Sequence, residues 1–153
     1  MKRIFLILCL IVLPIESMAD TFIGRVVAVL DGDTIEVLDD NKKLNRVRLI
    51  EIDAPEKNQA FGTASKRYLS SLVYKKEVIV DWQNKDRYDR LLATIRINKL
   101  NINLKMVSDG YAWAYDRYTI DTIYKQAQRQ AQAKRLGLWC DNQPIPPWEF
   151  RRK

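Results

Sequence analysis

Acidic and basic side chains gather in three segments of this sequence, each at an expected turn or strand end. Asp31-Gly32-Asp33-Thr34 places two carboxylates around a glycine, and Asp53-Ala54-Pro55-Glu56 places two more around a proline. Asp86-Arg87-Tyr88-Asp89-Arg90 mixes both charges. Carboxylate oxygens bind hard divalent cations and accept protons, and guanidinium groups bind phosphates in a bidentate manner. Together with Arg48, these segments are suited to metal-assisted chemistry at a phosphodiester, where a cation and two arginines meet the negative charge.

Each segment also has an ordinary structural interpretation when it is taken alone. An Asp-Gly pair between two strands is a common hairpin turn, and a charged strand or loop is usually just solvated. Found together in this order, the three segments indicate a functional site far more specifically than any one of them does alone.

The composition excludes several kinds of active site. The 153 residues include no histidine, which excludes a Ser-His-Asp triad, an imidazole base and a histidine-ligated zinc site. Any acid–base catalyst must then be a carboxylate, Lys, Tyr or Arg. Any metal site must be built mainly from oxygen atoms, which favours calcium, magnesium or manganese. The net charge of +7 favours an anionic partner, whether nucleic acid, acidic membrane or acidic polysaccharide.

The first residues have the pattern of a signal peptide. Lys2 and Arg3 precede a short apolar stretch from Ile4 to Ile15, and Ser17-Met18-Ala19 resembles a cleavage site. We expect a signal peptide at residues 1–19 and an exported protein, periplasmic or secreted, with no membrane association after cleavage. An uncleaved N-terminal anchor is the alternative.

The rest of the chain, residues 20–153, reads as one α+β domain. Alternating apolar residues predict strands, and helical spacing predicts helices. We expect a five-stranded OB-fold β-barrel with about three helices. The expected strands are 21–30, 34–38, 44–52, 77–82 and 91–97. The expected helices are 61–73, 103–108 (ended by Asp109-Gly110) and 121–135 (capped by Asp121, ended by Gly137). The proline-rich extension, residues 144–153, is expected to pack irregularly as a strap, with a partner-binding tail as the alternative.

The ordered segments resemble the staphylococcal (micrococcal) nuclease family, the thermonucleases. The resemblance runs from about Phe22 to Trp139, which is nearly all of the chain after the expected signal peptide. Its matching pieces are Val29–Thr34, Arg48, Asp53–Glu56, Asp86–Ala93, Gly110–Ala112, Ala131–Lys134 and Gly137–Trp139.

The resemblance implies a calcium-dependent nuclease that hydrolyses DNA and RNA and leaves 3′-phosphate products. Asp33 and Asp53 then correspond to carboxylate ligands of Ca²⁺, and Ala54 to a ligand through its backbone carbonyl. Glu56 corresponds to the general base or a group that positions water. Arg48 and Arg90 correspond to the two arginines that bind the phosphate. Asp31 corresponds to a residue near the metal that does not bind it directly.

Substrate contacts are expected from the basic and aromatic residues Arg87, Tyr88 and Tyr118, whereas Tyr115 is assigned to structural packing. Since no base-reading helix is evident, we expect little sequence specificity.

Two functions are the alternatives to an active nuclease: a catalytically inactive OB-fold nucleic-acid-binding module and a nonspecific polyanion-binding envelope protein. We expect a monomer. Cys140, the lone cysteine after cleavage, is expected to be a small hydrophobic residue beside Trp139.

Overall fold

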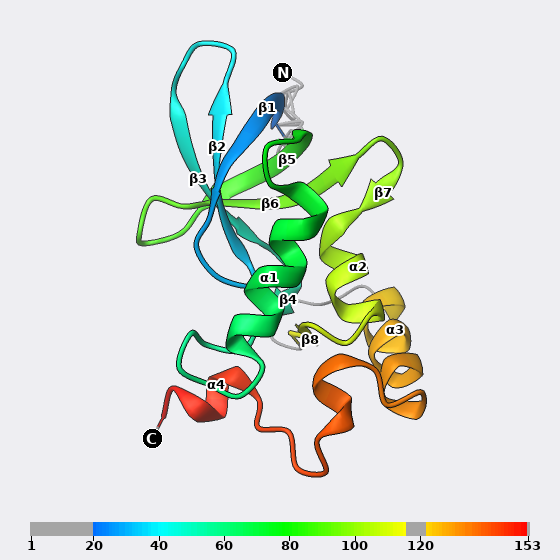
Figure 1. Ribbon diagram of the computed structural model, residues 1–153. Coiled ribbons are helices and arrows are strands. Elements are labelled where there is room, and N and C mark those ends of the chain that lie inside the picture. Colours follow the sequence, from blue (N-terminus) through cyan, green and yellow to red (C-terminus); the bar gives the residue numbers. More distant parts are fainter. Residues whose placement is uncertain (1–19, 116–121, 153) are drawn as a thin grey trace, which may run out of the picture.

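Five strands close into a barrel in the computed structural model, which describes residues 20–115 and 122–152 (Figure 1). The barrel strands are β1 (Asp20–Val29), β2 (Thr34–Asp39), β3 (Leu44–Leu49), β5 (Glu77–Lys85) and β6 (Leu91–Ile97). Neighbouring strands run antiparallel in the order β3-β2-β1-β5-β6, and a parallel pairing of β3 with β6 closes the ring. The expected OB-type barrel is thereby confirmed, and closure leaves both of these strands paired on two sides.

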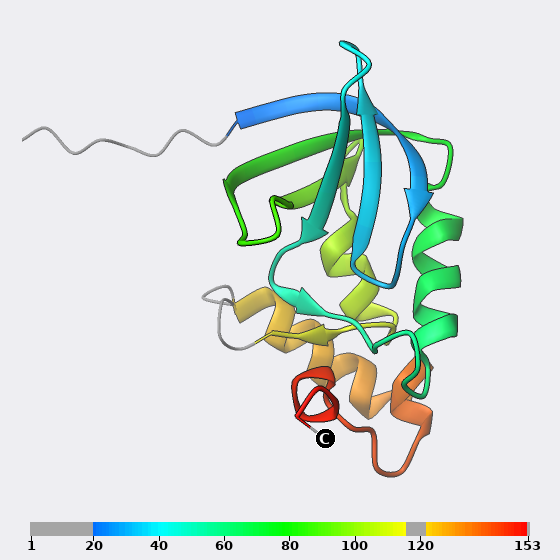
Figure 2. The same cartoon turned by 90° about the vertical axis from the view of Figure 1, so that its left-hand side faces the viewer.

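Short elements extend this barrel. The strand β7 (Leu100–Asn101) pairs antiparallel with the end of β6, and β4 (Ile52–Asp53) pairs with β8 (Trp113–Ala114) in a separate two-stranded sheet. The helices are α1 (Gly62–Val73), α2 (Ile102–Ser108), α3 (Thr122–Ala133) and α4 (Pro147–Phe150), with a 3₁₀ turn, η1 (Gly137–Cys140). Among the described elements, α2, α3 and α4 lie toward one end of the barrel, whereas α1 runs up along its side, and the C-terminal segment turns back beneath β4 and β8 (Figure 2).

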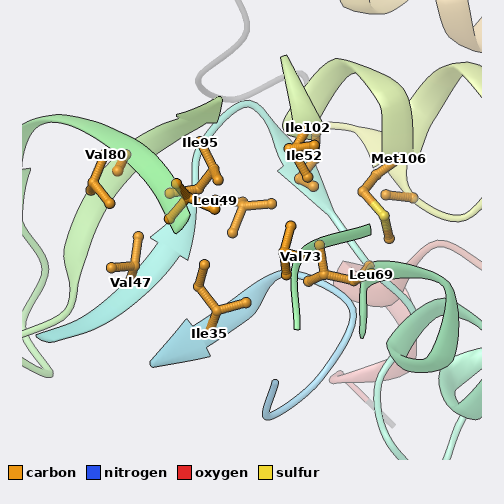
Figure 3. Close-up of a cluster of buried hydrophobic side chains, with 14 of the residues drawn as sticks. Ile35, Val47, Leu49, Ile52, Leu69, Val73, Val80, Ile95, Ile102 and Met106 are labelled. Atoms are coloured by element: carbon orange, nitrogen blue, oxygen red, sulfur yellow. The ribbon is translucent and has the colours of Figure 1, made fainter. Parts of the chain in front are cut away.

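The core fills the barrel and continues between α1 and α2 (Figure 3). The inward residues of the strands alternate with exposed ones, as on a half-buried sheet. Burial of each such large apolar side chain stabilises the fold by about 1.5–3 kcal/mol. The residues labelled in the figure are Ile35, Val47, Leu49, Ile52, Leu69, Val73, Val80, Ile95, Ile102 and Met106.

A buried asparagine joins α2 to the barrel. The side chain of Asn103 donates to the carbonyls of Ile50 and Ala93 at 3.1 and 3.0 Å and accepts from the N–H of Ile95 at 3.0 Å. Satisfied buried polar groups of this kind fix one arrangement of the backbone. Here the end of β3 is held against β6, close to the residues predicted to do chemistry.

Three expectations about elements are wrong. The strand expected at 44–52 ends at Leu49, because Glu51 adopts a left-handed conformation (φ 64°) and the chain restarts as β4. The terminator of α3 is Arg135 (φ 53°), whose N–H donates to the carbonyl of Gln132, and not Gly137. The extension after residue 144 contains a helix, α4, where irregular packing was expected.

One further expectation is confirmed, and two concern residues that the structure does not describe. Asp109-Gly110 ends α2 as predicted, with Gly110 at φ 79°. The expected signal peptide and the cap at Asp121 lie outside the described residues. Within the described ranges, no helix is long and apolar enough to cross a membrane.

Candidate active site

The turn between β1 and β2 places Asp33 beside the end of β3. The N–H of Asp33 donates to the Asp31 carboxylate at 3.0 Å, and its carbonyl accepts from the N–H of Leu49 at 2.8 Å. A Cβ on Gly32 would lie 2.0 Å from the Ser65 Oγ, so only glycine lets this turn pack against α1. The turn is thus more than a hairpin connection, because it fixes a carboxylate.

The strand β4 brings Asp53 to the same place. Asp53 pairs with Trp113 of β8, and its side chain is buried, with 2% of it exposed. The next residue, Ala54, donates its N–H to the Oδ2 of Asp33 at 2.8 Å. The two predicted metal-binding aspartates are therefore joined through one backbone hydrogen bond.

Arg48 connects both carboxylates. Its Nη2 lies 3.1 Å from the Oδ2 of Asp33 and 3.3 Å from the Oδ1 of Asp53. Its Nη1 donates to the carbonyls of Leu49 and Ile52, which holds the guanidinium in place. Two buried carboxylates thus converge on a single cationic nitrogen.

The environment of Asp33 favours a nearby positive charge. Burial raises the pKa of the Asp33 carboxyl to about 7, and Arg48 opposes that rise. The neighbouring Asp31 and Asp53 add to it, and the N–H of Ala54 lowers it. Because a buried carboxylate beside others is costly without a compensating charge, this site is suited to an additional cation.

The oxygen atoms here fit a hard divalent ion. Nowhere in residues 20–115 and 122–152 do three or more His, Cys, Asp or Glu side chains form a cluster that could hold a metal. The predicted set does not require one, since it consists of two carboxylates and the carbonyl of Ala54. Because one oxygen of Asp33 and one of Asp53 lie within 3.3 Å of the same nitrogen of Arg48, the two carboxylates are close enough to reach a common cation.

Glu56 follows the buried pair and reaches solvent. Its N–H donates to the side chain of Gln59 at 3.0 Å, and its own side chain is 38% exposed. The carboxylate accepts from Arg151 of the C-terminal segment at 2.6 Å, and Arg151 also contacts Asp53. Glu56 and Asp53 are thereby linked by one guanidinium, and Glu56 keeps access to water.

The second predicted clamp, Arg90, is held by Asp86. Asp86 accepts from the N–H and the Nε of Arg90 at 3.0 and 2.7 Å. Arg90 directly precedes β6, whose Leu92 pairs with Arg48 of β3. Arg90 therefore lies two residues before the strand neighbour of Arg48.

The predicted substrate-binding residues beside Arg90 are on the surface. Tyr88 is 63% exposed, and the guanidinium carbons of Arg87 and Arg90 lie 4.8 and 5.4 Å from its ring centroid. The third predicted residue, Tyr118, lies outside the described residues. Tyr115 packs on Trp148 with ring centroids 5.5 Å apart, which agrees with its structural assignment.

Sequence reasoning missed Arg151 and misjudged Cys140. Arg151 gave no signal beyond its place in a basic tail, although the Pro-Pro-Trp before it indicated packing. Cys140 is exposed, which contradicts its expected hydrophobic role. Its thiol donates to the carbonyl of Arg135, and Trp113 instead occupies the space against Trp139.

Comparisons with known proteins match this architecture. The sequence model of a family described as "Staphylococcal nuclease homologue" matches residues 46–141. A Haemophilus influenzae protein described as an uncharacterized endonuclease is 56% identical over 129 residues, covering 84% of this chain and 72% of the relative. A Shigella flexneri protein described as a micrococcal nuclease is 40% identical over 153 residues, covering 93% of this chain and 87% of the relative.

The fold and the comparisons define the class of protein. The closed barrel with its helices is an α+β domain of the OB type. The chain belongs to the staphylococcal nuclease family.

Proposed function

We propose that this protein is a calcium-dependent nuclease that hydrolyses phosphodiester bonds of DNA and RNA with little sequence specificity, leaving 3′-phosphate products. Membership of the family supports nuclease activity. The observation that carries the proposal is the convergence of the buried Asp33 and Asp53 carboxylates on one nitrogen of Arg48. Structural carboxylates are rarely buried together unless a cation accompanies them.

The metal site is proposed at Asp33, Asp53 and the carbonyl of Ala54. A bound Ca²⁺ would polarise a phosphoryl oxygen and offset the negative charge that repels a nucleophile. Calcium is selected from the hard cations by the family resemblance alone. Magnesium and manganese therefore belong in the same titration.

Arg48 and Arg90 are proposed to bind the phosphate. Charge grows on the phosphoryl oxygens toward the transition state, and guanidinium donors that are already oriented stabilise it. The carbonyls of Leu49 and Ile52 orient Arg48, and the carboxylate of Asp86 orients Arg90 through its Nε. Within residues 20–115 and 122–152, the hydrogen bonds of Arg90 to Asp86 use its backbone N–H and Nε, which leaves the terminal nitrogens available to a substrate.

Glu56 is proposed to accept a proton from the attacking water or to position that water. Its partial exposure supports access of water from solvent. A carboxylate is the natural base here because the chain has no histidine. Arg87, Tyr88 and Tyr118 are proposed to bind the nucleic acid through charge and stacking, which accounts for low sequence specificity.

Residues 1–19 are proposed to be a signal peptide that directs the protein to the periplasm or the medium, where it acts as a monomer. Cell fractionation with N-terminal sequencing tests this part. A mature protein that starts at Asp20 outside the cytoplasm supports it, and an intact Met1 in the cytoplasm contradicts it.

Digestion of DNA and RNA by the purified protein tests the proposed activity. We expect cleavage in calcium, none in chelator, and 3′-phosphate ends. Arg48→Ala and Arg90→Ala are each expected to lower the rate by about 10²–10³-fold, as the loss of one oriented donor does elsewhere. Glu56→Ala is expected to lower it by about 10²–10⁴-fold, as the loss of a general base does. Wild-type rates in all three variants would refute the residue roles. Binding of nucleic acid without cleavage in any divalent ion would instead favour the inactive binding module.

A further inference from the structure

The C-terminal segment is anchored next to the candidate active site by contacts of its own. The ring of Trp148 packs against Trp113 and Tyr115 at centroid distances of 5.6 and 5.5 Å, and Pro147 is buried. The side chain of Gln59 donates to the carbonyl of Ile145. These contacts place the end of α4 beneath β4, as the red helix in Figure 2 shows.

Arg151 caps this helix and takes both oxygens of Asp53. Its Nη2 lies 2.7 Å from the Oδ2 of Asp53, and its Nη1 lies 3.2 Å from the Oδ1. The same Nη1 donates to the Oε1 of Glu56 at 2.6 Å. Both carboxylate oxygens of Asp53 thus already contact Arg151, and Oδ1 also lies 3.3 Å from Nη2 of Arg48.

We propose that Arg151 is a built-in competitor of the divalent metal, which occupies the carboxylates of Asp53 and Glu56 until the ion displaces it. The inference rests on the metal site of the proposed function. A divalent ion that approaches the carboxylate of Asp53 meets the positive charge of a guanidinium that lies 2.7 and 3.2 Å from its two oxygens, so the two cations repel each other and compete for the same group. The anchored tail keeps the guanidinium at high local concentration, so the competition is intramolecular.

The competition has two measurable consequences. In the metal-free protein Arg151 offsets the charge of the Asp53 carboxylate, which is 2% exposed. Replacing Arg151 therefore lowers thermal stability. In the metal-bound protein those contacts are gone, so the loss has little effect. Because the Arg151 side chain is 44% exposed, we expect a moderate gain in calcium affinity, about tenfold.

Calorimetric titration with CaCl₂ tests the proposal in the purified wild type, Arg151→Gln, Arg151→Lys and Arg152→Gln. Arg152 is the matched control, since it is the adjacent exposed arginine of the same tail. Arg151→Gln should bind calcium about tenfold more tightly than the wild type, and Arg152→Gln should stay within about twofold. Arg151→Lys should fall between them, because a lysine presents one point charge instead of a fork.

Thermal denaturation provides the second measurement. In chelator, Arg151→Gln should melt about 3–6 °C below the wild type, and in saturating calcium the two should converge. Equal or weaker calcium binding by Arg151→Gln, while the wild type binds, overturns the competition and leaves the proposed metal site standing. Absence of calcium binding in every variant overturns the metal site and the competition together. If Arg151→Gln does not fold, Arg151→Lys decides by the same criteria.

Discussion

The ion pair between Asp86 and Arg90 can be used to test whether Asp86 orients the Arg90 side chain or only adds a negative charge to this loop. Asp86 accepts from the N–H of Tyr88 and from the N–H and Nε of Arg90, at 2.9, 3.0 and 2.7 Å. Asp86→Asn keeps one acceptor oxygen but turns an amide N–H₂ toward the Nε donor. We expect Arg90 to lose its fixed orientation while the loop keeps its length and shape.

The magnitude follows from the geometry of this pair. A hydrogen bond to a charged group contributes about 1.5–3 kcal/mol, and partial exposure of the pair reduces that to about 1–2 kcal/mol of stability. If Arg90 binds the transition state, partial misorientation should lower kcat/KM by about 10–30-fold, less than the complete loss of an oriented donor. Asp89→Asn is the matched control, because Asp89 lies in the same loop, is 82% exposed and pairs with the surface Lys85.

The pH dependence of the difference in stability between the wild type and Asp86→Asn provides an independent test of the ion pair. Partial burial raises the pKa of Asp86, but hydrogen bonds from Arg90 and Tyr88 outweigh it, and the net pKa lies below the usual 3.8. A carboxylate whose pKa is lowered by folding stabilises the protein above the unfolded pKa, and this contribution disappears as the pH falls through the folded pKa. The stability difference between the wild type and Asp86→Asn should therefore be full at pH 7 and shrink below about pH 4.

Urea denaturation at pH 7 and pH 3.5, together with DNA hydrolysis at neutral pH, measures both effects. Asp89→Asn should match the wild type in rate and in urea midpoint. Wild-type rates in Asp86→Asn, or a stability difference that does not change with pH, would refute the positioning role of Asp86.

Three further substitutions test other parts of the structure. Arg48→Lys should lower kcat/KM by about 10²-fold, because one ammonium cannot replace a guanidinium that contacts two carboxylates and two carbonyls; a rate close to wild type contradicts this. Gly32→Ala should cost about 1–3 kcal/mol in urea denaturation and weaken calcium binding, since the added Cβ meets Ser65 and the Cβ of Ala54; unchanged calcium binding would show that the turn does not fix Asp33. Asn103→Ala should cost about 2–4 kcal/mol, because it removes three hydrogen bonds from buried backbone groups, although the carbonyl of Ala93 keeps its bond from the N–H of Ile50; a loss within the error of the measurement would count against that network.

The barrel was predictable because its signals are local. Alternating apolar residues and Asp-Gly or Asn-Lys turns specify hairpins without reference to the rest of the chain. The order of Asp33, Arg48 and Asp53 along three adjacent strands or turns then brings these side chains together. The structure does so, with Arg48 between the two carboxylates.

The features that sequence reasoning missed depend on distant contacts. The break after Leu49 is held by Asn103, more than fifty residues away, which binds the carbonyl of Ile50. Gly137 looked like a helix terminator, but it lies against Gly110, and a Cβ on it would come within 2.2 Å of that carbonyl oxygen. Arg151 reaches Asp53 across 98 positions of sequence. Hydrophobic periodicity carries no information about such pairings.

The rate of DNA hydrolysis as a function of calcium concentration tests the central claim most directly, with the wild type compared with Asp33→Asn and Asp53→Asn. The buried pair of carboxylates predicts a saturable dependence on calcium in the wild type, no cleavage in chelator, and a loss of at least about 10²-fold in each variant at any calcium concentration. Cleavage that persists in chelator, or that proceeds at the wild-type rate in both variants, would contradict a metal site at Asp33 and Asp53.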